Sequence, residues 1–112
     1  MKKKKIYISG KIGSYEISQE VRENFERAEE YLMREGWDVV NPVNIHYQIE
    51  LKEHLVKIRK ARYDVYTEML IFDLKRIKKC TAIYMLPEWL DSPGARAEHY
   101  FAQAIGKEVI YG

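Results

Sequence analysis

The sequence contains few of the features that mark secreted or membrane proteins. Cysteine occurs once among 112 residues, at Cys80, which excludes a disulfide within one chain and favours a reducing compartment. No apolar run approaches the roughly 20 residues that a membrane-spanning helix needs. No signal-peptide pattern follows the N-terminal lysines. We therefore expect a cytoplasmic protein that does not enter a membrane.

The residues that build common cofactor sites are also scarce. The histidines, His46, His54 and His99, have no metal-ligand spacing among themselves or with the cysteine. Gly10 and Gly13 are too sparse for a dinucleotide fingerprint or a Walker loop. We therefore expect no metal, no nicotinamide and no ATP, and hence no cofactor.

Composition is ordinary for one globular domain, with 46% hydrophobic and 32% charged residues. The net charge is +2, and much of the basicity comes from Lys2 to Lys5, so no strong nucleic-acid binding is expected. The lysine run could touch nucleic acid, although a solvated tail over residues 1–5 is the simpler interpretation. No linker or repeat divides the chain, so residues 1–112 are expected to form a single domain.

Apolar periodicity alternates between strands and helices. It predicts strands at residues 6–9, 37–41, 82–86 and 109–111, and helices at about 17–35, 64–79 and 92–105. Gly36 and Gly106 are expected just after two of the helices. This order predicts a doubly wound (flavodoxin- or Rossmann-like) α/β fold with a parallel four-stranded sheet in the order 2-1-3-4. Ligands bind such sheets where the strand order reverses, beyond the carboxyl ends of the strands.

The stretch from residue 43 to 63 has the weakest pattern. Leu51, Leu55 and Ile58 suggest a helix whose polar side carries Lys52, Lys57, Arg59, Lys60 and Arg62. A basic amphipathic helix can bind membranes or acidic partners. A solvated outer face is the alternative interpretation.

Glu98 is the residue that points most clearly to a ligand. Its neighbours three and four positions away on the expected helix are Gly94, Ala95, Phe101 and Ala102. An acid on such a face is poorly solvated, and the small residues leave room beside it for something flat. The pattern favours a carboxylate that meets a ligand.

Three further residues support a polar site. Asp73 interrupts an apolar helical stripe formed by Tyr66, Met69, Leu70, Leu74 and Ile77, so it needs a partner or ligand if buried; alternatively it lies on the helix surface. Tyr7 shares a strand face with Ser9 and could orient Glu98, or could be a core tyrosine. Ser92 begins a helix, where it could cap the backbone, bind an anion, or do both.

Several sequence blocks together resemble a known group of proteins. They are Ile6-Tyr7-Ile8-Ser9-Gly10, Val39-Val40-Asn41-Pro42, Asp73-Leu74 with Cys80, and Ala82-Ile83-Tyr84-Met85-Leu86-Pro87 with Trp89, Ser92, Gly94, Ala95 and Glu98. They resemble a small DUF4406-like family of unknown function from phages and prophages. That family is similar to the nucleoside 2-deoxyribosyltransferase-like superfamily, which includes nucleoside 5′-monophosphate N-glycosidases.

The resemblance implies roles for individual residues. It makes Glu98 the nucleophile at the anomeric carbon, Tyr7 the residue that orients it, and Asp73 a contact to the base. Ser92 stands where nucleotide-directed members bind the 5′-phosphate and nucleoside transferases carry an acid, which favours a monophosphate substrate. Further substrate contacts are expected from Ser9, Gly10, Lys11, Trp89 and Gly94.

The resulting expectation is an N-glycosyl hydrolase or transferase acting on a nucleoside 5′-monophosphate or nucleoside. Two alternatives remain open: a catalytically silent nucleotide-binding or sensing module, and a phage accessory protein that binds partners through residues 43–63. Because small subunits of this fold class often complete their sites across an interface, a homo-oligomer is also expected. Its candidate interface aromatics are Tyr47, Tyr63, Tyr66 and Trp89.

Overall fold

The computed structural model describes residues 4–13, 16–58 and 65–112. Its elements follow the order β1(Lys5–Ser9), α1(Gln19–Arg34), β2(Asp38–Val40), α2(Ile45–Ile58), α3(Val65–Lys78), β3(Ala82–Met85), a short 3-10 helix η1(Trp89–Asp91), α4(Pro93–Ala104) and β4(Glu108–Tyr111). The strands form one parallel sheet ordered β2-β1-β3-β4. The predicted fold class and strand order are therefore confirmed.

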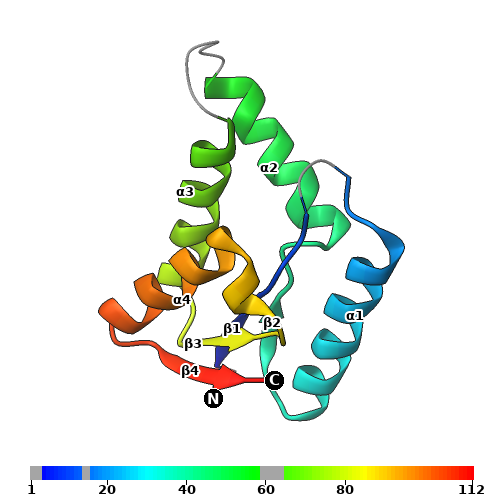
Figure 1. The fold of residues 1–112 in the computed structure, drawn as a ribbon, viewed down its shortest axis with the longest axis vertical. Helices are drawn as coiled ribbons and strands as arrows, with labels where there is room; N and C mark the ends of the chain where they lie inside the picture. The colour runs from blue at the N-terminus through cyan, green and yellow to red at the C-terminus, as the bar shows by residue number, and fades with distance from the viewer. Residues whose placement is uncertain (1–3, 14–15, 59–64) are drawn as a thin grey trace.

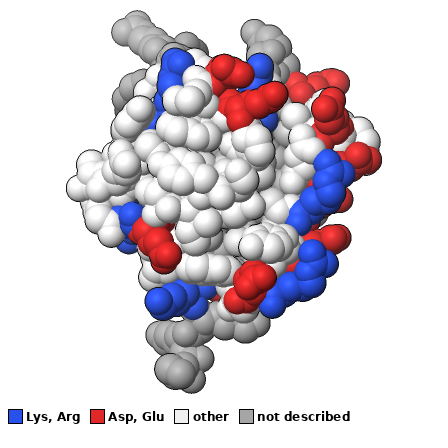
Figure 2. Space-filling model, turned by 60° about the horizontal axis from the view of Figure 1, so that its bottom comes forward, with Lys and Arg blue, Asp and Glu red and all other residues white. Residues whose placement is uncertain are grey.

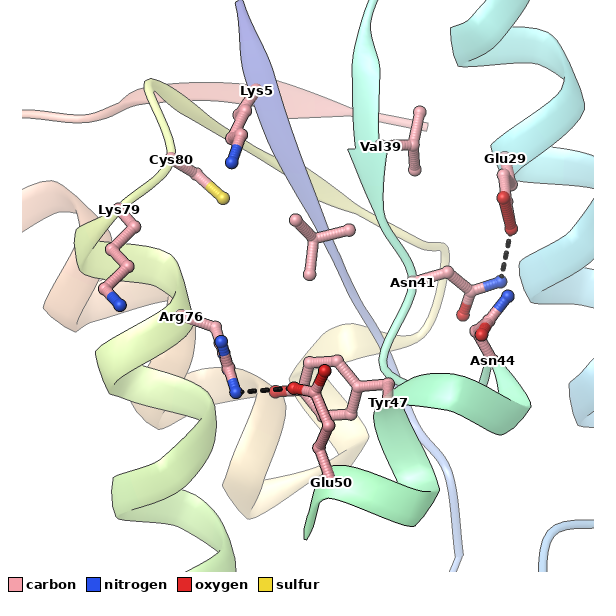
Figure 3. Close-up of a pocket in the computed structure, with 11 residues that line it drawn as sticks. Lys5, Glu29, Val39, Asn41, Asn44, Tyr47, Glu50, Arg76, Lys79 and Cys80 are labelled. Carbon is pink, nitrogen blue, oxygen red and sulfur yellow. Dashed lines mark hydrogen bonds and ion pairs between the residues drawn. The ribbon is translucent and has the colours of Figure 1, made fainter.

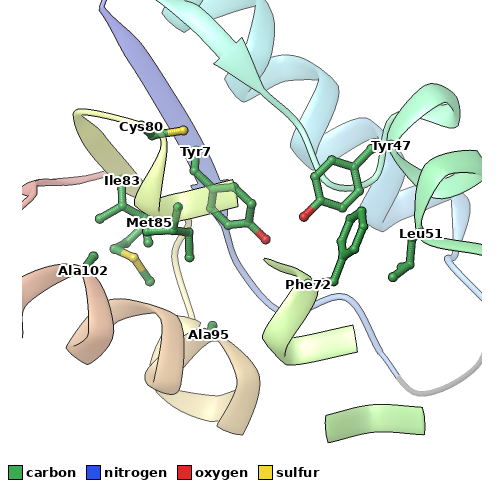
Figure 4. Close-up of a cluster of buried hydrophobic side chains, with 10 residues drawn as sticks. Tyr7, Tyr47, Leu51, Phe72, Cys80, Ile83, Met85, Ala95 and Ala102 are labelled. Carbon is green, nitrogen blue, oxygen red and sulfur yellow. The ribbon is translucent and has the colours of Figure 1, made fainter. Parts of the chain in front are cut away.

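The sheet separates two layers of helices (Figure 1). Alternation along β1 directs Ile6 and Ile8 to a core shared with α1, whereas Tyr7 faces a second core formed with α2, α3 and α4. Tyr47, Phe72, Ile83 and Met85 belong to the second core (Figure 4). One face of the first strand thus looks toward three helices that come from distant parts of the sequence.

Capping serines and glycines mark the ends of α1 and α4. Ser18 and Ser92 accept backbone hydrogen bonds from Val21 and Ala95 at the starts of α1 and α4, each at 3.2 Å. Gly36 and Gly106, which follow the carboxyl ends of the same helices, adopt positive φ angles of 92° and 77°, a conformation that glycine adopts without steric cost. These signals fix where α1 and α4 begin and end.

The predicted inward stripe of α3 is wrong in part. Tyr66 is 54% exposed, whereas Phe72, which was not predicted to face inward, is 7% exposed. Phe72 packs edge-to-face against Tyr47 of α2, with ring centroids 5.5 Å apart. Because α3 contacts both α2 and α4, its buried surface is wider than a single stripe.

For residues 43–63, the predicted helix is present, but one predicted interface aromatic is not on the surface. The helix is confirmed as α2, with Leu51 buried. Tyr47 is 8% exposed and part of the core, so its prediction as an interface aromatic is wrong. Tyr63 lies outside the described residues, as do Arg59, Lys60 and Arg62 of the predicted basic face.

Charged side chains are distributed unevenly over the surface. Figure 2 shows a broad face on which lysine, arginine, aspartate and glutamate are confined mainly to the margins.

None of the described helices is long and apolar enough to cross a membrane.

Candidate functional site

Glu98 projects from α4 onto the carboxyl end of β1. Its carboxylate accepts hydrogen bonds from the Ser9 hydroxyl at 2.7 Å and from the Tyr7 hydroxyl at 3.2 Å, one on each oxygen. The residue is 6% exposed, and both hydroxyl donors are 1% exposed. Two buried donors therefore hold the Glu98 carboxylate in one orientation, as predicted for Tyr7.

Small residues on α4 allow this close approach. Ala95 and Ala102, one turn before and after Glu98, are both buried in the core shared with the sheet. Their short side chains let the helix lie near the strands, so the glutamate reaches β1 across β3. Parallel pairing of β1 with β3, with Ser9 opposite Met85, completes the arrangement.

Asp73 enters the same site from α3. Its carboxylate accepts a 2.6 Å hydrogen bond from the Tyr47 hydroxyl of α2, and it interacts electrostatically with Glu98. The hydroxyl groups of Tyr7 and Tyr47 point into the space between the sheet and the helices (Figure 4). Glu98 and Asp73 therefore lie in one site, where Tyr7 donates a hydrogen bond to Glu98 and Tyr47 donates one to Asp73.

Burial dominates the electrostatics of the pair. Loss of hydration raises the pKa of Glu98 well above the usual carboxyl range, and the nearby Asp73 carboxylate raises it further. The pKa of Asp73 is also raised by burial, although hydrogen bonds from Tyr47 and Glu98 oppose that rise. Burial likewise raises the pKa of both tyrosines, so both remain hydrogen-bond donors at neutral pH. The pair of acids therefore retains a proton more readily than two solvated carboxylates would.

Tyr47 is the site residue that the sequence did not reveal. Its helix lies in the stretch with the weakest periodicity, where the sequence predicts Tyr47 as an aromatic of a subunit interface. The available signal was the spacing of Tyr47 and Leu51 by four positions, which places both on one helix face. Only the packing of α2 against α3 shows that this face covers Asp73.

The predicted substrate residues occupy two different surroundings. Ser92 is partly buried at the first turn of α4, and its hydroxyl accepts the Ala95 N–H. Gly94 lies in the same turn, where an added Cβ would come 3.0 Å from the Tyr66 hydroxyl oxygen. Trp89, just before this helix, stacks on His99 with ring centroids 4.1 Å apart. All three residues lie on the α4 side, with Glu98.

Gly10 and Lys11 directly follow the carboxyl end of β1. A Cβ on Gly10 would come 2.8 Å from the Leu86 side chain, so glycine allows the segments that follow β1 and β3 to approach each other. Lys11 lines a cavity of about 640 Å³ on the α1 side, together with Ser18, Phe25, Pro87 and others. The structure thus separates Lys11 from Glu98, which contacts β1 from the α4 side.

A second cavity, of about 310 Å³, lies beside β2 under the α2–α3 pair (Figure 3). Tyr47 and Cys80 form part of its wall, and so do Arg76 and Glu50, which form an ion pair at 2.7 Å. Neither Glu98 nor Asp73 lines this cavity or the one beside α1. Among the described residues, no cluster of three or more His, Cys, Asp or Glu side chains could hold a metal ion.

Comparison with known proteins shows the family to which the chain belongs. Residues 4–111 match the family described as Domain of unknown function (DUF4406). The chain belongs to this family. No curated protein matches it. The DUF4406 domain therefore covers β1 to β4 and includes every residue of the Glu98–Asp73 site.

Proposed function

We propose that this DUF4406 protein is an N-glycosyl hydrolase or transferase that acts on a nucleoside 5′-monophosphate or nucleoside, with Glu98 as nucleophile. The observation that carries the proposal is the placement of Glu98: a buried carboxylate with one hydroxyl donor on each oxygen, at the carboxyl end of β1. Doubly wound sheets bind ligands at that end, where the strand order reverses. We further propose that the family is a branch of the nucleoside 2-deoxyribosyltransferase-like superfamily and that this chain comes from a phage or prophage.

The chemistry assigned to Glu98 is a double displacement. A Glu98 oxygen forms a bond to the anomeric carbon, and the carbon–nitrogen bond breaks with its electron pair leaving on the base. The base takes up a proton, and water or a second base then displaces the glutamate from the sugar. Ser9 and Tyr7 keep the attacking oxygen in place, which reduces the entropy lost on reaching the transition state.

Asp73 completes this assignment as the residue that meets the base. Because burial raises the pKa of both acids, the pair holds a proton that can pass from Glu98 to Asp73. That transfer produces an ionised nucleophile and a proton donor in one step. The departing base requires such a proton, so the coupling of the two acids supports glycosyl chemistry.

Ser92 directs the proposal toward monophosphates. Its hydroxyl lies at the N-terminus of a 12-residue helix, where the backbone N–H groups and the helix dipole favour an anion. An acid at this position would repel a phosphate. The helix that carries the nucleophile thus also begins at the proposed phosphate contact.

A nucleotide-binding module is the second candidate. Both oxygens of Glu98 are already hydrogen-bonded within the protein, and only 6% of the residue is exposed. A carboxylate so engaged can shape a binding pocket without reacting. A phage accessory protein acting through residues 43–63 is a third candidate, for which the exposed Ile45, Ile49 and Val56 of α2 offer a contact surface.

Release of free base separates these candidates. Ribo- and deoxyribonucleosides and their 5′-monophosphates are incubated with wild-type protein, with Glu98→Gln, and with Glu53→Gln as a control at an exposed glutamate. Chromatography is expected to show base release by wild type and Glu53→Gln alone, with or without an added acceptor base. Calorimetry on Glu98→Gln is expected to show that nucleotide binding remains. Binding by wild type with no release under either condition would reject the enzyme and favour the module.

A further inference from the structure

Within the part of the chain that the structure describes, β4 has a neighbouring strand on one side only. β4 is one of the two edge strands of the sheet, the other being β2; it lies beside β3 and packs against α4. Figure 1 shows it at the margin of the molecule. Its sequence, Glu108 to Tyr111, contains no proline and no lysine, the residues that commonly prevent pairing at an exposed edge. A short, mainly apolar edge strand of this kind is a template for another strand.

Hydrogen bonding shows which backbone groups face outward. The N–H groups of Glu108 and Gly112 donate to Thr81 and Met85, in or beside β3, at 3.2 and 2.8 Å. Because successive residues direct their N–H and C=O groups to opposite sides of a strand, those of Val109 and Tyr111 point away from β3. Two outward-facing residues, separated by Ile110, are therefore available to a partner.

Aromatic side chains extend this edge on both faces of the sheet. On the α4 side, Tyr111 contacts Trp89, which in turn contacts Tyr100; Tyr100 and Tyr111 are each 56% exposed. On the α1 side, the rings of Tyr31 and Tyr84 lie 6.3 Å apart. β4 lies at the bottom of Figure 1, the side that comes forward in Figure 2 with its nearly uncharged face.

We propose that the β4 edge binds β4 of a second copy of this chain, antiparallel, so that one sheet runs through the dimer. In this register Val109 of one copy lies opposite Tyr111 of the other, and a twofold axis passes between the two Ile110 residues. The outward-facing groups of both copies are then paired. Glu108 lies opposite Gly112, so the two Glu108 side chains do not face each other across the strands.

The strand is self-complementary, which favours a second copy over an unrelated peptide. A stable interface buries about 800 Å² on each partner, more than a strand of four residues supplies alone. The exposed side chains of Tyr100 and Tyr111 flank the strand and are proposed to add apolar area; tyrosine is enriched in such interfaces. The contact is isologous, as in most homodimers.

Disulfide crosslinking tests the register directly. In the proposed dimer the two Ile110 residues form a non-hydrogen-bonded pair with Cα atoms about 4.5 Å apart, within the range that a disulfide bridges. Ile110→Cys is therefore expected to give a covalent dimer on mild oxidation, seen on a non-reducing gel. Glu108→Cys is the matched control: its symmetry mate lies four residues further along the strand, roughly 13 Å away. The native Cys80 is buried, so wild type is expected to remain uncrosslinked.

Light scattering at tens of micromolar tests the dimer itself, with Val109→Pro as the second variant. Proline at 109 removes an N–H that faces the open edge and leaves the hydrogen bonds to β3. Wild type is expected to be dimeric and Val109→Pro monomeric, with unchanged far-ultraviolet circular dichroism. A monomeric wild type, a dimeric Val109→Pro, or equal crosslinking of Glu108→Cys and Ile110→Cys would each overturn the proposal. A monomer that binds an extended peptide at β4 would assign the edge to a different partner.

Discussion

Tyr47 and Asp73, 26 residues apart in the sequence, are joined by a 2.6 Å hydrogen bond between the phenol and the carboxylate. The bond ties α2 to α3 beside Glu98, because Asp73 also interacts with that glutamate. Tyr47 therefore affects the ionisation of the site as well as the packing of the core. It favours the ionised form of one acid and so affects how the proton of the pair is shared.

We expect Tyr47→Phe to lower the free energy of unfolding by roughly 1–2 kcal/mol. The loss should grow as the pH rises through the raised pKa of Asp73, because the phenol stabilises the ionised carboxylate. Denaturant titrations on both sides of that pKa measure this dependence. Tyr31→Phe, at a tyrosine that is 45% exposed, is the matched control. A deficit independent of pH would show that Tyr47 contributes only packing.

Glu98→Gln is expected to be more stable than wild type at alkaline pH. Burial raises the pKa of Glu98 in the folded protein, so its stabilising contribution is present below the ordinary carboxyl pKa and is lost as pH rises through the raised one. Each unit of that rise corresponds to about 1.4 kcal/mol. Glutamine does not ionise and so avoids the loss.

Thermal melting of wild type, Glu98→Gln and Glu53→Gln at about pH 5 and pH 9 measures the difference. Wild type and the Glu53→Gln control should lose stability together at the higher pH, and Glu98→Gln should lose less. Parallel curves for all three proteins would mean that the carboxylate is well solvated in the folded state.

Ser92→Asp should separate helix capping from phosphate binding. Aspartate is as good an N-cap as serine, so the melting temperature should change little. The added charge should repel a 5′-phosphate, and we expect the preference for monophosphates over nucleosides to fall about tenfold or more, equivalent to about 1.4 kcal/mol. Ratios of kcat/KM for matched nucleoside and nucleotide pairs provide the measurement. An unchanged ratio would remove Ser92 from the phosphate site.

Local sequence signals predicted the sheet and half of the site. Alternation in β1 placed Tyr7 and Ser9 on one face, and Ser92 and Gly106 bounded the helix that carries Glu98. These features depend on neighbours within a few residues, which a single sequence displays. The predicted meeting of Tyr7 with Glu98 followed from strand order and is confirmed by the hydrogen bond.

The other half of the site depends on helix packing. Only its apolar neighbours predict that Asp73 lies in the interior. The same argument predicts that Tyr66 faces inward, although Tyr66 is 54% exposed. The orientation of α3 is set by simultaneous contact with α2 and α4. Periodicity describes one buried face of a helix, so it missed Phe72 and the Tyr47–Asp73 contact.

The most direct measurement of the central claim is the mass of the protein during turnover. Wild-type protein is mixed with the best substrate of the base-release screen, or with its 2′-fluoro analogue to slow breakdown of the sugar ester, and is quenched in acid. Intact mass spectrometry should show one pentose phosphate, or pentose, bound to each reacted chain, and peptide mapping should place it on Glu98. Glu98→Gln should carry no adduct. Base release by wild type without any adduct, or an adduct on another residue, would contradict the assignment of Glu98 as nucleophile.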